Sequence, residues 1–397
     1  MRSLTPLELI KPNKLTSTPI KLIILACSIL INTTLLSSCS ERAAQEQENE
    51  KDSTANTEAS NIDFQAANAR LWVAGDKAFN TNIAAVEQLT QNINAFLNTP
   101  SAKTLTNAQQ QWLKSTLQYQ ESMVFLQLAE AAPKTLPSLE QLRFRLGAFP
   151  IQPGFLDAFG NYKHAGLIND IGFPLSKESL THQHGLTSSE DIALGFYAME
   201  FMLFGINEDA REPSEYLKIE TLTSAQRDIG YESPKELPQN RRRRLLSLQA
   251  DTALQDTHLL KSIWAQQTKK RWSKLSAEQQ LASMRTTRTS TTELVTREIE
   301  TLMGITNNEA LDSEVTKAPH PTILRSLKSQ DQATFFYNNI KSLTATTAFF
   351  SNQQEVQAQL DVATDVLQIL QQDSNGDETS ALWKQAHTAL NKLAQTL

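Results

Sequence analysis

The residues best suited to bind a metal ion are two histidines and one glutamate near the middle of the chain. His182 and His184 flank a single glutamine, and Glu200 follows in a segment that is otherwise apolar. Imidazole nitrogen and carboxylate oxygen are common ligands of transition metals, so these residues are the candidate metal ligands. Two histidines alone form a weak site, and a solvated loop that caps the next helix is the competing interpretation.

Glu200 needs an explanation of its own, because it is the only charge between Asp191 and Glu208. An isolated buried carboxylate is unfavourable, so we expect either an ion pair or a raised pKa. The candidate partners are Arg143, Arg145 and Arg211. Tyr197 lies three residues earlier, on the same face of a helix, and could hydrogen bond to Glu200.

Two other motifs have weaker chemical interpretations. Residues 373–377 match the first ligand positions of a calcium loop, but Glu378 replaces the turn glycine, so we predict a turn between helices. Arg241–Arg244 could bind phosphate or anionic lipid heads; a charged helix start compensated by Glu236 is the interpretation we favour. The chain has no His-Glu-x-x-His, no Gly-x-Ser-x-Gly and no nucleotide-binding fingerprint.

The N-terminus predicts a lipoprotein. Basic residues precede a short apolar run from Leu22 to Ile31, which is typical of a signal peptide and too short to span a bilayer. Leu36-Ser37-Ser38-Cys39 then resembles the bacterial lipobox, so residues 1–38 are the expected signal peptide and Cys39 the expected lipidation site. Because Ser40 rather than Asp follows the cysteine, we expect the periplasmic face of the outer membrane.

The composition of the chain after the expected signal peptide predicts an acidic folded domain on a flexible tether. The chain has a net charge of −6, and loss of residues 1–38 leaves −9, so nucleic acid is not an expected partner. Residues 39–61 contain few large apolar side chains and predict a disordered tether of about 25 Å. Cys27 and Cys39 are the only cysteines, so the mature chain has no disulfide.

Hydrophobic periodicity predicts helices along the rest of the chain. Apolar residues recur at three- and four-residue steps from Phe64 to Phe96 and from about Asn107 to Ala131. Prolines and glycines cluster in residues 133–187, which predicts a long connection. Residues 187–190 have capping-box form and predict a buried helix over residues 191–205. Further helices are expected at residues 241–264, 277–303, 328–350, 353–371 and 378–396.

Two internal echoes suggest a duplication. The segment 105–110 recurs at 275–280, and the segment 191–197 recurs at 331–337, in the same order. A helical hairpin cannot bury its apolar stripe alone, so we expect an all-α fold of two related antiparallel helical bundles. The predicted boundaries are residues 62–230 and 231–397.

The segment Gly195-Phe196-Tyr197-Ala198-Met199-Glu200 resembles the imelysin signature, Gly-x-His-x-x-Glu. Residues 150–157 resemble the Pro-to-Ile-Asp loop of that family, and Trp112, Tyr119 and Phe125 resemble its second helix. The likeness covers most of residues 62–390. It implies an exported bacterial protein of two helical bundles that is associated with iron uptake, in a family historically called peptidases.

The sequence departs from the signature at one position that matters for chemistry. Tyr197 stands where the family has histidine, and the family's second-helix Arg and Glu fall on Thr116 and Met123. A neutral phenol, with an ordinary pKa of about 10, is a weak metal ligand. We therefore expect a binding role rather than catalysis.

The expected function is a non-catalytic binding or accessory lipoprotein in iron or haem acquisition. Its expected ligand is iron or another divalent metal, and its expected partners are the membrane, through Cys39, and components of iron or haem uptake. The first alternative is a metal-dependent peptidase that uses Glu200, His182 and His184. The second is a structural lipoprotein of envelope assembly.

Overall fold

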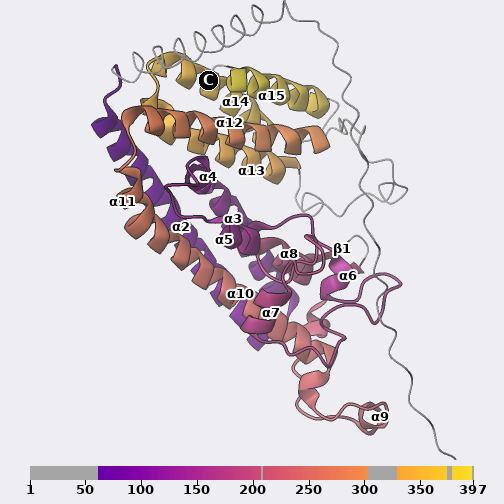
Figure 1. Ribbon diagram of the computed structural model, residues 1–397. Coiled ribbons are helices and arrows are strands. Elements are labelled where there is room, and N and C mark those ends of the chain that lie inside the picture. The colour runs from indigo at the N-terminus through magenta and orange to yellow at the C-terminus, as the bar shows by residue number, and fades with distance from the viewer. Residues whose placement is uncertain (1–60, 207–208, 303–328, 373–377, 396–397) are drawn as a thin grey trace, which may run out of the picture. The chain divides into compact units, whose positions relative to one another are not determined.

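The computed structural model describes residues 61–206, 209–302, 329–372 and 378–395 (Figure 1). In these residues the only named strands are a short antiparallel pair, β1 (Gly205–Ile206) and β2 (Asp209–Ala210). The predicted all-α fold is confirmed. None of the helices described is long and apolar enough to cross a membrane. The predicted signal peptide, Cys39, almost the whole tether and the turn at residues 373–377 lie outside the described residues.

The helical elements follow one another along the chain, and the longest described connection runs from α6 to α7. Their bounds are α2 Phe64–Asn98, α3 Ala102–Glu121, α4 Met123–Ala131, α5 Glu140–Gly147, α6 Pro153–Leu156, α7 Lys177–Gln183, α8 Phe196–Phe204, η1 Pro213–Tyr216, α9 Ser224–Asp228, η2 Pro234–Glu236, α10 Pro238–Ile263, the π-helical turn η3 Trp264–Thr268, α11 Lys269–Trp272, α12 Ala277–Leu302, α13 Ser329–Ser342, the 3-10 segment η6 Leu343–Phe349, α14 Gln353–Gln372 and α15 Glu378–Gln395.

The N-terminal half is organised around α2, α3, α8 and α10. Asp63 caps the start of α2, because its side chain accepts from the Ala66 N–H at 3.0 Å, and Ser101 and Thr104 form a capping box at the start of α3. α3 packs along α2, and α8 packs on both α3 and α10. α10 follows the predicted boundary at residue 230, yet it packs along α2, as Figure 1 shows.

Three of the four consecutive arginines at the start of α10 bind the long connection, namely Arg241, Arg242 and Arg244, whereas Arg243 donates to the carbonyl oxygens of Leu97 and Tyr216. Arg241 donates to the carbonyl oxygens of residues 167, 168, 170 and 173, at 2.6 to 2.9 Å. Arg242 donates from Nε to Asp157 at 2.6 Å, and Asp157 is fully buried. Glu236, the compensating carboxylate that we expected, acts electrostatically on Arg241, whereas the partner of Arg242 is a carboxylate of the connection.

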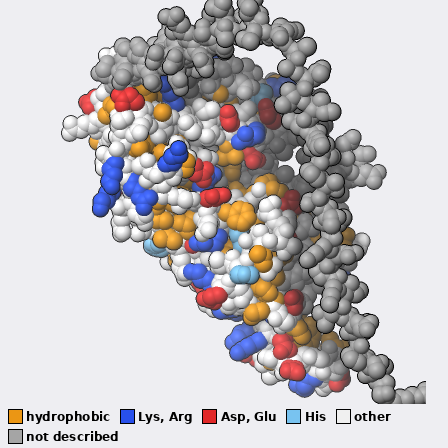
Figure 2. Space-filling view, in the orientation of Figure 1, with side chains coloured by type: hydrophobic (Ala, Val, Ile, Leu, Met, Phe, Trp, Pro, Cys, Tyr) orange, Lys and Arg blue, Asp and Glu red, His pale blue; other side chains and the backbone are white. Residues whose placement is uncertain are grey.

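The C-terminal half consists of α12, α13, η6, α14 and α15. α14 packs between α13 and α15, and α12 contacts α15 and α13. The two halves meet where α12 packs on α4 and α13 packs on α3. Acidic and basic side chains are interspersed on the face that Figure 2 shows.

Three local expectations differ from the structure. The run predicted as one helix to Ala131 is interrupted at Ser122, where the Ser122 hydroxyl donates to the Tyr119 carbonyl at 2.7 Å. α8 begins at Phe196 rather than at residue 191, because Gly195 has φ +95° and ends any helical path before it. His182 lies in α7 rather than in a loop. The predicted burial of α8 is confirmed, since residues 196–203 are all buried.

Candidate functional site

A cavity of about 190 Å³ lies where the two halves meet, and we call it the inter-bundle cavity. Helices α3, α4, α5, α8, α12 and α13 contribute to its wall. Its lining residues are Tyr119, Gln120, Met123, Arg143, Gly147, Phe149, Tyr197, Leu294, Val295, Glu298, Phe335, Phe336 and Asn339. The signature position Tyr197 is therefore part of a concave site that both halves build.

Gly195 and α3 together determine where Tyr197 lies. A Cβ at Gly195 would come within 2.3 Å of the Arg145 carbonyl oxygen, so the backbone of α5 packs directly against this glycine. Trp112 Nε1 donates to the Phe196 carbonyl at 2.7 Å, which fixes the first turn of α8 on α3. The glycine of the signature thus has a physical role: it lets α8 begin in close contact with α5.

A polar network crosses the cavity from one half to the other. Asn339 Nδ2 donates to Gln120 Oε1 at 3.0 Å, and the Gln120 side chain also hydrogen bonds with Tyr197. Asn339 Oδ1 is buried and has no hydrogen-bond partner among the described residues. A buried acceptor without a donor is destabilising by about 1–3 kcal/mol, so this oxygen favours a ligand that can satisfy it.

The ionisable groups of the cavity are poorly solvated. Burial raises the pKa of the Glu298 carboxyl above its ordinary value, with a smaller opposing effect from Arg297. Burial raises the pKa of Tyr119 to about 12 and the pKa of Tyr197 well above 10. Arg143 also lines the cavity, but it forms an ion pair with Glu130. No ion pair to Glu298 is found in the part of the chain that the structure describes.

Glu200 lies one turn after Tyr197 and is buried, at 8% exposure. Burial alone raises the pKa of the Glu200 carboxyl well above its ordinary value. The three arginines considered as partners pair elsewhere, as follows: Arg143 with Glu130, Arg145 with Asp256, and Arg211 with Asp157 and Glu215. Of the two alternatives for Glu200, the raised pKa is the one found, and the predicted hydrogen bond from Tyr197 is replaced by one with Gln120.

The two histidines of the predicted metal site have separate surroundings. His184 is buried, its Nδ1 accepts from the Leu194 N–H at 3.2 Å, and its Nε2 lies 3.1 Å from the Phe144 carbonyl oxygen. The two ring nitrogens therefore join the backbone before α8 to the backbone of α5. His182 is exposed. Among the described residues there is no group of three or more His, Cys, Asp or Glu that could hold a metal, so these histidines and Glu200 do not converge.

The positions that differ from the family pattern fall at or near the cavity. Met123 lines it, and Thr116 is fully buried with a hydroxyl that has no described partner. Sequence reasoning missed Glu298 and Asn339, which come from the other half of the chain. Only the echo of residues 191–197 at 331–337 pointed toward α13, and nothing pointed toward Glu298.

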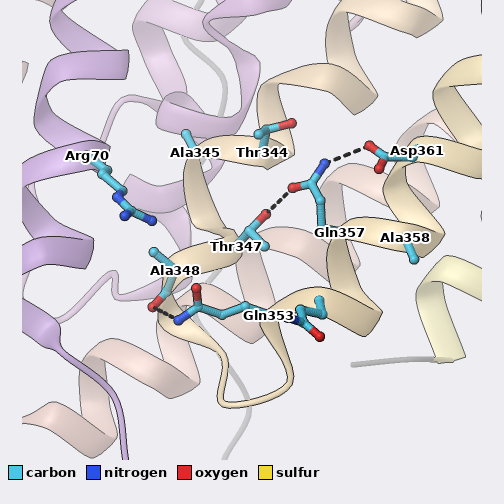
Figure 3. Close-up of a pocket in the computed structure, with 10 residues that line it drawn as sticks. Arg70, Thr344, Ala345, Thr347, Ala348, Gln353, Gln357, Ala358 and Asp361 are labelled. Carbon is cyan, nitrogen blue, oxygen red and sulfur yellow. Dashed lines mark hydrogen bonds between the residues drawn. The ribbon is translucent and has the colours of Figure 1, made fainter.

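A second hollow lies between α2, η6 and α14, with a volume of about 510 Å³ (Figure 3). Arg70 lies on one side of it, and Thr347, Gln357 and Asp361 lie on the other. These three bond to one another, with Thr347 donating to Gln357 at 3.3 Å and Gln357 donating to Asp361 at 2.7 Å. Because these polar groups satisfy each other, this hollow shows less need for a ligand than the inter-bundle cavity.

Comparison with known proteins is consistent with this architecture. A solved structure reported as an iron-regulated protein A precursor from Parabacteroides distasonis is similar, with a TM-score of 0.52 and 13% identity, and the match covers 83% of this chain and 94% of that chain. At this identity the likeness shows the fold. A search of curated proteins found no match. The family model described as imelysin matches residues 77–397, and the chain therefore belongs to the imelysin family.

Proposed function

We propose that this protein is an exported, lipid-anchored accessory protein that binds iron in the inter-bundle cavity without catalysing a reaction. The observation that carries the proposal is that two unsatisfied groups line the same cavity. Glu298 is a desolvated carboxyl without a described ion-pair partner, and Asn339 Oδ1 is a buried acceptor without a described donor. The name of the similar solved structure, which refers to iron regulation, agrees with this choice of ligand.

The chemistry of two lining residues supports a hard cation. Glu298 offers a carboxylate and Asn339 an amide oxygen, whereas the neutral phenols of Tyr119 and Tyr197 are weak ligands. Oxygen donors suit hard ions, and no histidine or cysteine is among the lining residues. A bound cation would add positive charge next to Glu298, beyond the small effect of Arg297, and would favour the ionised form of the carboxyl.

The size of the cavity supports an ion rather than haem. Pockets for drug-sized ligands are about 300–1,000 Å³, whereas this cavity is about 190 Å³. A water molecule occupies about 30 Å³, so the cavity has room for an ion with several waters. Iron is therefore the ligand we propose, and haem is not.

Titration calorimetry of the mature chain with ferric citrate, ferrous iron and haem tests this proposal. We expect one-to-one binding of iron, a loss of at least tenfold in affinity for Glu298→Gln, and no binding of haem in the cavity. Glu293→Gln removes an exposed carboxylate from the same helix and serves as the matched control. Absence of iron binding, or equal affinities for the two variants, would overturn the proposal.

The lipid anchor is a separate part of the proposal and rests on the lipobox at residues 36–39. Acyl chains contribute about 0.8 kcal/mol per buried methylene, so lipid on Cys39 can hold the protein on a membrane. Labelled palmitate should enter the native protein and the Cys27→Ser variant but not Cys39→Ser. Labelling of Cys39→Ser would show that the anchor lies elsewhere or is absent.

A further inference from the structure

The N-terminus of α10 forms one wall of a third cavity, of about 490 Å³, which we call the α10 pocket. Its lining residues are Leu175, Lys235, Asn240, Arg241 and Arg244. Three of these side chains are cationic and none is acidic. A hollow whose charged lining has one sign focuses its electric field and favours an oppositely charged ligand.

Arg241 is the buried cation of the α10 pocket, at 6% exposure. Its Nε and Nη2 donate to carbonyl oxygens of the connection, but no hydrogen bond from its Nη1 is found among the described residues. Its guanidinium therefore keeps donors free at a position that lines the cavity. Since its partners are neutral carbonyls, the charge of Arg241 is also left without a paired carboxylate.

Lys235 and Arg244 add two exposed cations to the same pocket. Arg244 donates only to the Leu175 carbonyl, at 3.3 Å, and no ion pair is found for either side chain in the described chain. Arg241 and Arg244 are three residues apart on one helix face, where like charges repel each other. An anion between them would remove this repulsion.

The nearby carboxylates are already engaged by the backbone. Glu236 Oε2 accepts from the N–H groups of Glu232 and Ser233, at 2.8 and 3.2 Å. Asp170 Oδ1 accepts from the Gly172 N–H at 3.0 Å. Both lie close enough to Arg241 to act on it electrostatically, but neither forms an ion pair with it.

α10 itself contributes positive potential. It is 26 residues long, it begins with Pro238, and no side chain caps its first turn. Uncapped N–H groups at the start of a long helix favour an anion, and an arginine fork matches the geometry of a phosphate. The cationic cavity and the free donors of Arg241 are the main reasons to expect an anion in the α10 pocket, and the helix end adds to them.

We infer that the α10 pocket binds the phosphate group of a phosphate monoester. The volume exceeds that of a bare phosphate ion, so there is room for a small polar group such as glycerol. This site is separate from the inter-bundle cavity and does not depend on iron binding. The phosphate could belong to a soluble ester or to a lipid headgroup, and the experiment distinguishes the two sources.

Calorimetry of the mature chain with glycerol phosphate, and sedimentation with vesicles containing phosphatidic acid, test the inference at constant ionic strength. We expect saturable binding of glycerol phosphate and a loss of at least tenfold in affinity for Lys235→Gln/Arg244→Gln, both of which are exposed. The matched control, Lys270→Gln/Arg271→Gln, removes the same charges from exposed positions elsewhere and should change affinity less than twofold.

The two probes distinguish a soluble ester from a lipid headgroup. Binding of glycerol phosphate without vesicle binding identifies a soluble ester, whereas vesicle binding that glycerol phosphate displaces identifies a headgroup. Absence of binding to both probes overturns the inference. Equal losses in the pocket variant and the control variant also overturn it, because they indicate only a general attraction to positive charge.

Discussion

Replacing Gly195 by alanine should destabilise the protein more than replacing Gly230, which also has a positive φ but has open space around its Cβ position. Gly195 has φ +95° and ψ −179°, a region that is essentially restricted to glycine and is unfavourable for other residues by about 1–3 kcal/mol. In addition, the new Cβ would lie 2.3 Å from the Arg145 carbonyl oxygen and 2.6 Å from that of Leu146. Forcing atoms into a packed region destabilises by about 1–3 kcal/mol.

The two effects together predict a loss of about 4 kcal/mol in the free energy of unfolding for Gly195→Ala. At about 2 °C per kcal/mol for a large domain, the melting temperature should fall by about 8 °C. Gly230→Ala is the matched control, because Gly230 has φ +100° but nothing lies within 4 Å of its Cβ position. It should lose only about 1–2 kcal/mol.

Urea unfolding followed by circular dichroism at 222 nm measures both variants directly. We expect a clearly larger loss of unfolding free energy for Gly195→Ala than for Gly230→Ala. Equal losses would show that the contact between α8 and α5 is not tight, and the account of how Tyr197 is positioned would then be wrong.

Three further predictions concern buried charges. Asp157→Asn removes the buried carboxylate that Arg211 and Arg242 share and leaves them only Glu215, so it should destabilise by about 3–5 kcal/mol in urea unfolding, whereas exposed Glu220→Gln should change stability by less than about 1 kcal/mol. Because the pKa of Glu200 is raised, the native state should lose stability as the pH rises from below the ordinary pKa of the carboxyl toward the raised value. Glu200→Gln should remove this loss and stabilise the protein at pH 7. An unchanged slope of stability against pH would contradict the burial of a protonated carboxyl. Burial lowers the pKa of His184, so the stability of the native state should fall as the pH drops through about 6.5, by at most about 1.4 kcal/mol per pH unit. His184→Gln should flatten this slope. His182→Gln, the control, should leave it unchanged.

Local patterns in the sequence predicted most helices well. The steps from Phe64 to Phe96 and the stop at Asn98 correspond to α2, and the helices predicted near 277, 353 and 378 are found there. These elements depend on periodicity and capping, which a single sequence contains. The start of α8 was misjudged because residues 187–190 have capping-box form while the positive φ of Gly195 depends on its contact with α5.

The candidate site was harder to predict than the helices. Tyr197 and Glu200 were found because a motif and an isolated charge mark them in the sequence. Glu298 and Asn339 were missed because they join Tyr197 only through the packing of α12 on α4 and of α13 on α3. The roles of Arg241 and Arg242 were also inaccessible, since their partners lie about seventy or more residues earlier in the chain.

Anomalous diffraction from crystals soaked in iron shows directly whether iron binds in the inter-bundle cavity. We expect a peak at the iron edge within this cavity, close to Glu298 and Asn339, and its loss in Glu298→Gln crystals. A peak at His182 or elsewhere on the protein, or no peak at saturating iron, would contradict it.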